Sequence, residues 1–217
     1  MIKNITAAAS LLMLLFCFSA VSAEDSPGPA SGFLNTADAV GAGVGLIGGS
    51  VGFGDDAAAV YGSFTYGIAD YTDIRFKLGF ADLDAPDSDL ELLLGFDFKY
   101  ELLDYSDTLQ NNPLDFALGA FIEYVDYEGF PILELGGNII GSIPYQFDNG
   151  YRIVPYACLN IRMERVEYDA ADESDTDIQG GLNLGTKFEL SDDLNLFGEF
   201  QLDGNTGIYL GLDVRVF

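Results

Sequence analysis

Apolar and polar residues alternate along most of this chain with a period of two. In residues 90–102 every even position is apolar or aromatic, whereas the odd positions include Glu91, Asp97, Lys99 and Glu101. A helix would distribute these two sets around its circumference, but a strand separates them onto opposite faces. The pattern therefore predicts a β-strand with one apolar and one polar face.

The same alternation recurs in seven further segments, with weaker patterns near residues 40–53 and 57–68. The seven segments are residues 74–81, 114–123, 133–145, 153–163, 182–189, 194–202 and 208–216. Together they predict ten strands, with eight as the alternative because the first hairpin is glycine-rich and weakly patterned. A phase change near Ile47 suggests a β-bulge there.

The connections between these segments fall into two classes. Tight turns at residues 69–72, 148–150 and 191–193, with a longer link at 105–113, alternate with acidic links at 55–56, 82–89, 126–130 and 167–177. Consecutive antiparallel strands would place one class at each end of the sheet. We therefore expect an all-β, up-and-down antiparallel transmembrane β-barrel over residues 39–217.

The transmembrane interpretation depends on which face of the barrel points inward. The apolar stripes carry large Leu, Phe and Ile side chains, whereas the opposite stripes carry Gly, Ala, Ser, Asn and charged residues. A narrow lumen needs small side chains and paired charges, while lipid accepts large apolar ones, and a Lys or Arg facing lipid costs about 2–4 kcal/mol. Aromatic residues near the strand ends match interfacial girdles: Tyr66, Tyr100, Tyr145, Tyr151 and Phe188 near the short-turn end, and Phe80 and Tyr124 near the other. A secreted soluble sandwich or lipocalin-like barrel, with the opposite orientation, is the alternative.

Charged residues on the non-apolar stripes are the predicted lining of the lumen. Asp97 and Glu101 are expected to pair with Lys99 and Lys187, and the near balance of interior charge suggests a constricted or closed bore. The predicted lumen-lining residues are Arg75, Lys77, Glu91, Asp97, Lys99, Glu101, Asp115, Glu123, Glu134, Arg152, Arg162, Glu164, Lys187, Glu189, Glu199, Asp213 and Arg215.

The N-terminus has the three parts of a secretory signal. Lys3 precedes an apolar stretch that is too short to span a membrane, and small residues at Val21 and Ala23 suit signal peptidase. Residues 1–23 are therefore expected to be cleaved, and residues 24–38 are expected to form a short periplasmic lead. Cleavage leaves Cys158 as the single cysteine, which we interpret as a packed side chain.

Composition excludes several functions. A net charge of −26 argues against nucleic-acid binding, which depends on Lys and Arg. The chain contains no histidine, so the common hydrolase triads and histidine-ligated metal sites are excluded. We expect no catalytic residues, no cofactor and no specific metal ligands. The acidic runs at residues 82–89 and 169–177 are interpreted as solvated loops that attract divalent cations nonspecifically.

The signal peptide, the alternating meander, the two classes of connection and the terminal Phe217 together resemble the small bacterial outer-membrane barrels, the opacity-protein and OmpA-like group. In that group a C-terminal Phe is read by the barrel-assembly machinery, although here Arg215 and Asp213 interrupt the usual apolar register before it. The resemblance implies a location in the outer membrane, both termini in the periplasm and the acidic loops outside.

The function expected from these features is that of a structural or surface-interaction protein. Its partners would be outer-membrane lipid, the assembly machinery and an unidentified surface partner. A narrow porin-like channel for small solutes is the first alternative, and a secreted soluble binding domain is the second.

Overall fold

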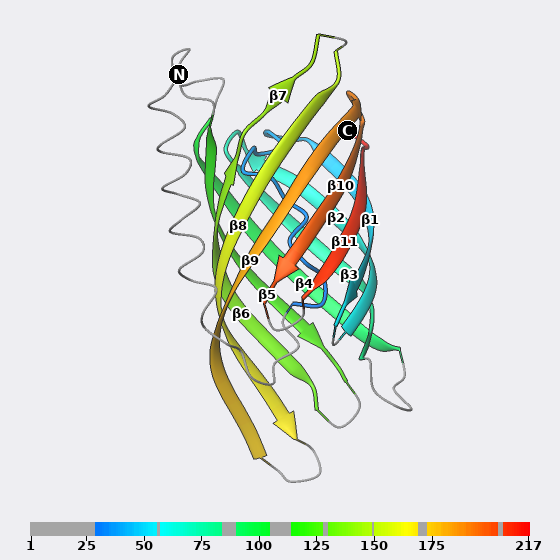
Figure 1. Ribbon diagram of the computed structural model, residues 1–217, viewed down its shortest axis with the longest axis vertical. Coiled ribbons are helices and arrows are strands. Elements are labelled where there is room, and N and C mark those ends of the chain that lie inside the picture. The colour runs from blue at the N-terminus through cyan, green and yellow to red at the C-terminus, as the bar shows by residue number, and fades with distance from the viewer. Residues whose placement is uncertain are drawn as a thin grey trace.

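The structure is a computed structural model that describes residues 29–55, 57–83, 90–104, 114–127, 130–148, 150–168, 173–203 and 206–217. Within these ranges all regular elements are β-strands (Figure 1). In chain order the strands are β1 (Gly45–Gly54), β2 (Ala57–Ala69), β3 (Thr72–Leu83), β4 (Glu91–Leu103), β5 (Asp115–Val125), β6 (Ile132–Ser142), β7 (Tyr145–Gln146), β8 (Arg152–Tyr168), β9 (Glu173–Ser191), β10 (Leu194–Leu202) and β11 (Gly207–Arg215).

The sheet closes on itself into a barrel. Each long strand pairs antiparallel with its neighbour in the sequence, β1 pairs with β11, and β6 pairs directly with β8. The two-residue β7 pairs only with the start of β8 and lies outside this ring. The wall of the barrel therefore contains ten strands, which confirms the predicted up-and-down architecture and the larger of the two strand counts.

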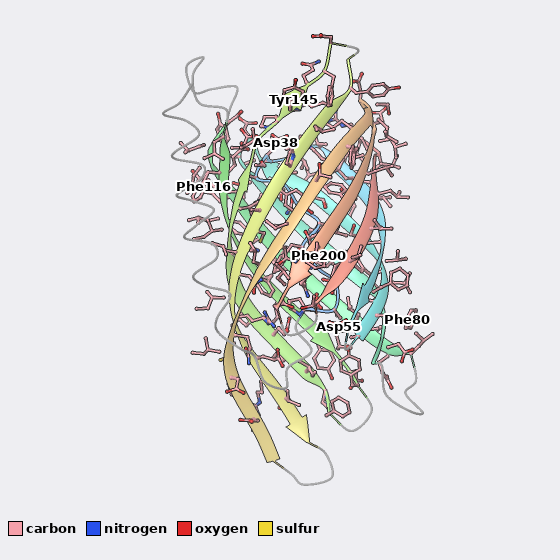
Figure 2. All side chains as sticks on the ribbon, viewed as in Figure 1. Asp38, Asp55, Phe80, Phe116, Tyr145 and Phe200 are labelled. Carbon is pink, nitrogen blue, oxygen red and sulfur yellow. The ribbon has the colours of Figure 1, made fainter. Side chains whose placement is uncertain are left out.

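The alternation of side chains orients the wall as predicted. On β4, Leu92 is 39% exposed on the outer surface, whereas Lys99 is only 3% exposed on the inner one. Figure 2 shows Phe80 and Phe116 pointing away from the barrel. The large apolar side chains thus face outward, and polar side chains fill the interior.

The two ends of the barrel differ. One end, here called the turn end, holds the β2–β3 and β9–β10 turns and the C-terminus; the other, the loop end, holds the β1–β2, β3–β4, β5–β6, β8–β9 and β10–β11 connections. At the loop end the β8–β9 hairpin extends beyond the other strands (Figure 1). No helix in the described ranges is long and apolar enough to cross a membrane.

Strand β1 contains no bulge, contrary to the suggestion from its phase. Its pairing with both neighbours is continuous from Leu46 to Phe53. The apparent phase change arises because Leu46 is an apolar residue that faces inward and is buried, whereas Ile47 begins the exposed apolar set on the outer face.

The segment before β1 lies inside the barrel. Residues 29–40, called the plug segment below, form the blue trace within the ring of strands in Figure 1. Pro29, Ser31, Phe33 and Ala37 are almost completely buried. The expected periplasmic lead over residues 24–38 therefore needs correction, because residues 29–38 fill the lumen instead. The proposed signal peptide, residues 1–23, and residues 24–28 lie outside the described residues.

Candidate functional site

The lumen binds the plug segment through its backbone. Glu199, on β10, accepts hydrogen bonds from the backbone N–H groups of Phe33 at 2.8 Å and Leu34 at 2.7 Å. Its Oε2 also accepts from the hydroxyl of Tyr156 at 2.7 Å. Hydrogen bonds to charged groups are each worth about 1.5–3 kcal/mol. One buried carboxylate therefore fixes two consecutive residues of the plug.

Cations of the wall bind the carbonyl groups of the same segment. Arg75 donates from Nη2 to the carbonyl of Phe33 at 2.5 Å and from Nη1 to that of Leu34 at 3.2 Å. Lys99 donates to the carbonyls of Thr36 at 2.9 Å and Asp38 at 2.8 Å. Interior charges thus satisfy both the donors and the acceptors of a backbone that has no strand partner.

The deepest part of the plug segment is held toward the loop end. Ser31 donates from both its backbone N–H, at 3.2 Å, and its hydroxyl to the carboxylate of Glu123. The Tyr61 hydroxyl donates to the Ser31 carbonyl at 2.7 Å, and Lys77 donates to the Ser31 hydroxyl at 2.8 Å. Pro29 is fixed by Gln201, whose amide donates to the Pro29 carbonyl at 3.0 Å. The plug is therefore bonded along its whole length.

Apolar contacts complete the fit. Phe33 packs edge-on against Phe121, with ring centroids 5.0 Å apart. Phe33 and Ala37 belong to one buried cluster with Cys158, whose side chain is completely buried. The prediction that Cys158 is a packed side chain is confirmed. The plug contributes two residues, Phe33 and Ala37, to the buried cluster that contains it.

The plug backbone adopts conformations that its surroundings enforce. Gly32 has a φ of +60°, and Leu34 has a φ of +41°, which is unusual for a residue with a side chain. Gly41 and Gly43, with φ values of +85° and +77°, reverse the chain from the lumen into β1 at the turn end. Glycine has no Cβ penalty there.

The structure buries twelve of the seventeen predicted lumen-lining residues inside the barrel. The twelve are Arg75, Lys77, Asp97, Lys99, Glu101, Asp115, Glu123, Glu134, Arg162, Glu164, Lys187 and Glu199. Glu91 is half-buried at the loop end. Arg152, Glu189 and Asp213 are half-buried, Arg215 is exposed, and these four line a cavity at the turn end.

The ion pairs inside the barrel differ from the expected ones. Asp97 pairs with Arg75 and, at 3.2 Å, with Lys77. Lys99 pairs with Asp73 at 3.3 Å, and Lys187 pairs with Glu189 at 2.9 Å. The expected pairing of Asp97 and Glu101 with Lys99 and Lys187 is therefore wrong. The β3–β4 register is the reason, because it places Arg75 opposite Asp97 and Asp73 opposite Lys99.

A second charged cluster lies nearer the loop end and does not contact the plug through any described hydrogen bond. Arg162 forms ion pairs with Glu134 at 3.1 Å, Asp203 at 3.4 Å and Glu164 at 3.7 Å. Nearby, burial and the charge of Glu123 raise the pKa of the Tyr127 phenol above its ordinary value.

The turn end of the lumen opens into a cavity of about 960 Å³. Its walls carry both signs of charge, among them Arg152, Lys187 and Glu189. The plug residues that line it are Leu34, Asn35, Thr36, Asp38, Ala39 and Val40. The plug segment forms the inner boundary of this cavity. The arrangement is suited to blocking passage through the barrel.

Aromatic residues lie on the outer face near both ends, as the sequence suggests. The aromatic residues predicted for the interfaces, Tyr66, Tyr100, Tyr145, Tyr151, Phe188, Phe80 and Tyr124, are all exposed or half-buried. Phe217 joins them, with its ring centroid 6.2 Å from that of Tyr66. Val216 N–H donates to the Gly45 carbonyl, and Gly45 N–H donates to the Phe217 carbonyl. Val216 and Phe217 therefore both lie opposite Gly45. This local irregularity lets Phe217 face outward although Asp213 and Arg215 precede it at alternate positions.

Several interior residues were not predicted from the sequence. Asp73 is buried one position before the apolar set of β3. It lies on the same face as Arg75, and this shared parity could have identified it as an interior residue. Tyr156 lies inside because Gly185 leaves room against its ring. Gly52 does the same for Tyr209, whose alternation already assigns it to the face opposite the apolar stripe. The plug itself has no alternation, and its only signal is a run of small residues.

Comparisons with known proteins give matches to solved structures. No family model and no curated protein matches this chain. The N-terminal barrel of Pseudomonas aeruginosa OprF is 12% identical over 81% of this chain and 99% of that chain, with a TM-score of 0.38. The KdgM porin is 10% identical over 79% of this chain and 99% of that chain, with a TM-score of 0.39. An outer-membrane channel from Pseudomonas putida F1 is 12% identical over 89% of this chain and 100% of that chain, with a TM-score of 0.36.

Proposed function

We propose that this chain is an integral outer-membrane β-barrel protein whose lumen is closed by its own N-terminal segment. In this proposal it acts as a structural or surface-interaction protein, not as an enzyme or an open pore. The observation that carries the proposal is the plug segment, bonded at its backbone to Glu199, Arg75, Lys99 and Glu123.

The outer surface supports insertion into a membrane. Large apolar side chains stand exposed on every strand of the barrel wall, from Ile47 on β1 to Leu212 on β11. Moving a fully exposed side chain of this kind into an apolar phase contributes about 1.5–3 kcal/mol, and each of these partly exposed side chains would gain part of that. Strand lengths of 9 to 19 residues meet the roughly 9–11 residues needed to cross the hydrocarbon layer. Closure of the sheet satisfies the backbone throughout.

The first test concerns location. Outer membranes of cells that express the chain are isolated, and the protein is run on denaturing gels with and without boiling. A membrane barrel should remain in the membrane fraction until detergent is added and should migrate differently when unheated. Recovery from the periplasm without detergent, with identical mobilities, would support the soluble alternative.

The second test concerns closure and uses planar-bilayer conductance. The folded full-length protein should show no sustained openings, whereas deletion of residues 24–40 should produce discrete and reproducible ones. A matched control, Asp175→Asn with Asp177→Asn, removes two exposed carboxylates from the β8–β9 hairpin and should remain closed. Steady conductance by the full-length protein would support the porin-like alternative instead.

The turn-end cavity gives the channel alternative a specific basis. It is open to solvent and reaches the plug segment, so displacement of the plug would extend it through the lumen. The resulting path would be lined by Arg75, Lys99 and Asp97, and would therefore suit small charged solutes.

A further inference from the structure

Three carboxylates gather at the turn end, where the plug segment leaves the lumen. One carboxylate oxygen each from Glu101, Asp104 and Asp115 lie within 4.8 Å of one another. Asp115 is 2% exposed and Glu101 is 4% exposed, whereas Asp104 is half-buried. They belong to neither acidic run that the sequence suggested for cations.

The local backbone brings these three groups together. The β4–β5 register shifts between Glu101 and Leu103, so Leu102 is an extra residue on β4. Leu102 and Leu103 are both exposed on the outside, and Asp104 returns to the side of Glu101. Next to the Leu103–Phe116 pair, Asp115 begins β5. A bulge of this kind commonly re-aims a side chain.

One buried oxygen in this cluster has no partner among the described residues. Glu101 Oε2 accepts a hydrogen bond from the backbone N–H of Ala39 at 2.8 Å, but Glu101 Oε1 is buried and no described residue donates a hydrogen bond to it. Among the described residues no Lys or Arg nitrogen lies within ion-pair distance of Glu101, since Lys99 pairs with Asp73. Buried carboxylate oxygens ordinarily have a donor or a cation.

We propose that Glu101, Asp104 and Asp115 form a divalent-cation site of the calcium class. Calcium takes six to eight oxygen ligands at about 2.3–2.6 Å, so oxygens on opposite sides of one ion are up to about 5 Å apart. Three carboxylates provide part of this set, and water completes it. The bound ion gives Glu101 Oε1 its missing partner. Through the Glu101–Ala39 hydrogen bond, it also ties the β4–β5 wall to the plug where the plug exits.

The test is calorimetric titration of calcium chloride into the folded, full-length protein in detergent. It is done at an ionic strength of about 0.15 M, where exposed charges are largely screened. The wild type should bind one calcium per chain saturably. Glu101→Gln should weaken binding at least about ten-fold, because it retains an acceptor for Ala39 but removes the charge. Asp104→Asn should weaken it similarly. The double variant Asp175→Asn, Asp177→Asn should bind as the wild type does.

Three results would overturn the site. They are the absence of saturable calcium binding by the folded wild type, unchanged affinity in folded Glu101→Gln or Asp104→Asn, and an equal loss in the hairpin control. Unheated gel mobility identifies folded variants, and half-buried Asp104 keeps the test decisive if the Glu101 variant fails to fold. The measurement needs no bilayer, so its outcome is independent of whether the barrel conducts.

Discussion

Arg75 and Arg162 are both buried inside the barrel, but they have different kinds of partner. Arg162 is surrounded by side chains of the wall and its loops: Glu134, Glu164 and Asp203. Arg75 shares Asp97 with Lys77 and directs its remaining donors to carbonyls of the plug. One cation therefore holds the wall together, and the other holds the plug to the wall.

This difference predicts that Arg162 contributes to the stability of the barrel wall and Arg75 to closure of the lumen by the plug. The ion-pair partners of Arg162 among the described residues all lie outside residues 29–40. The Arg75 site is complete only when Phe33 and Leu34 are in place. Variants of the two arginines should consequently affect different measurements.

The largest effect on stability is expected for Arg162→Met. The change leaves Glu134, Glu164 and Asp203 close together without their cation, and breaking a buried pair in this way costs about 3–5 kcal/mol. Urea unfolding of the protein in detergent, followed by gel mobility, should show a clearly lower midpoint, while folded Arg162→Met should remain closed in bilayers. An unchanged midpoint would show that the cluster does not stabilise the wall.

Arg75→Met should have a smaller effect on stability and a larger one on closure. Asp97 retains Lys77, so the principal loss is the pair of bonds to the plug, worth about 1.5–3 kcal/mol each. Bilayer recordings should show transient openings that are absent from the wild type and from Arg162→Met. Equally closed recordings for both variants would contradict the division of roles between the two arginines.

The smallest effect is expected for Arg165→Ala. Arg165 pairs with Glu167 at 2.9 Å, but both side chains are about half exposed on the β8–β9 hairpin. Exposed pairs contribute about 0–1 kcal/mol. The unfolding midpoint and the conductance should both match the wild type. A fall in the midpoint as large as that of Arg162→Met would show that burial does not explain the different effects of the two arginine variants on stability.

The barrel wall could be predicted from the sequence because burial on one face only requires strict alternation. Leu92 and Lys99 are assigned to opposite faces by parity alone, and the structure agrees. Parity does not identify ion-pair partners, however. Asp97 and Glu101 share a face with Lys99, yet the register with β3 decides that Asp97 contacts Arg75. Register depends on turns and bulges, which the alternation does not encode.

The plug could not be predicted from local patterns. Residues 29–40 form neither a strand nor a helix, and their partners, such as Glu199 and Arg75, are distant in the sequence. The carboxylate cluster is hidden for another reason, because the register shift between β4 and β5, and not the alternation, brings Asp104 near Glu101 and Asp115. The plug site exists only after the barrel has closed around residues 29–40.

Thiol labelling of Cys158 tests most directly whether the N-terminal segment fills the lumen. Cys158 is completely buried and shares a cluster with Phe33 and Ala37 of the plug. A small charged methanethiosulfonate should leave folded wild-type protein unmodified, and it should label both the urea-unfolded protein and a folded variant that lacks residues 24–40. Rapid labelling of Cys158 in the folded wild type, or continued protection in the folded deletion variant, would contradict the presence of a plug.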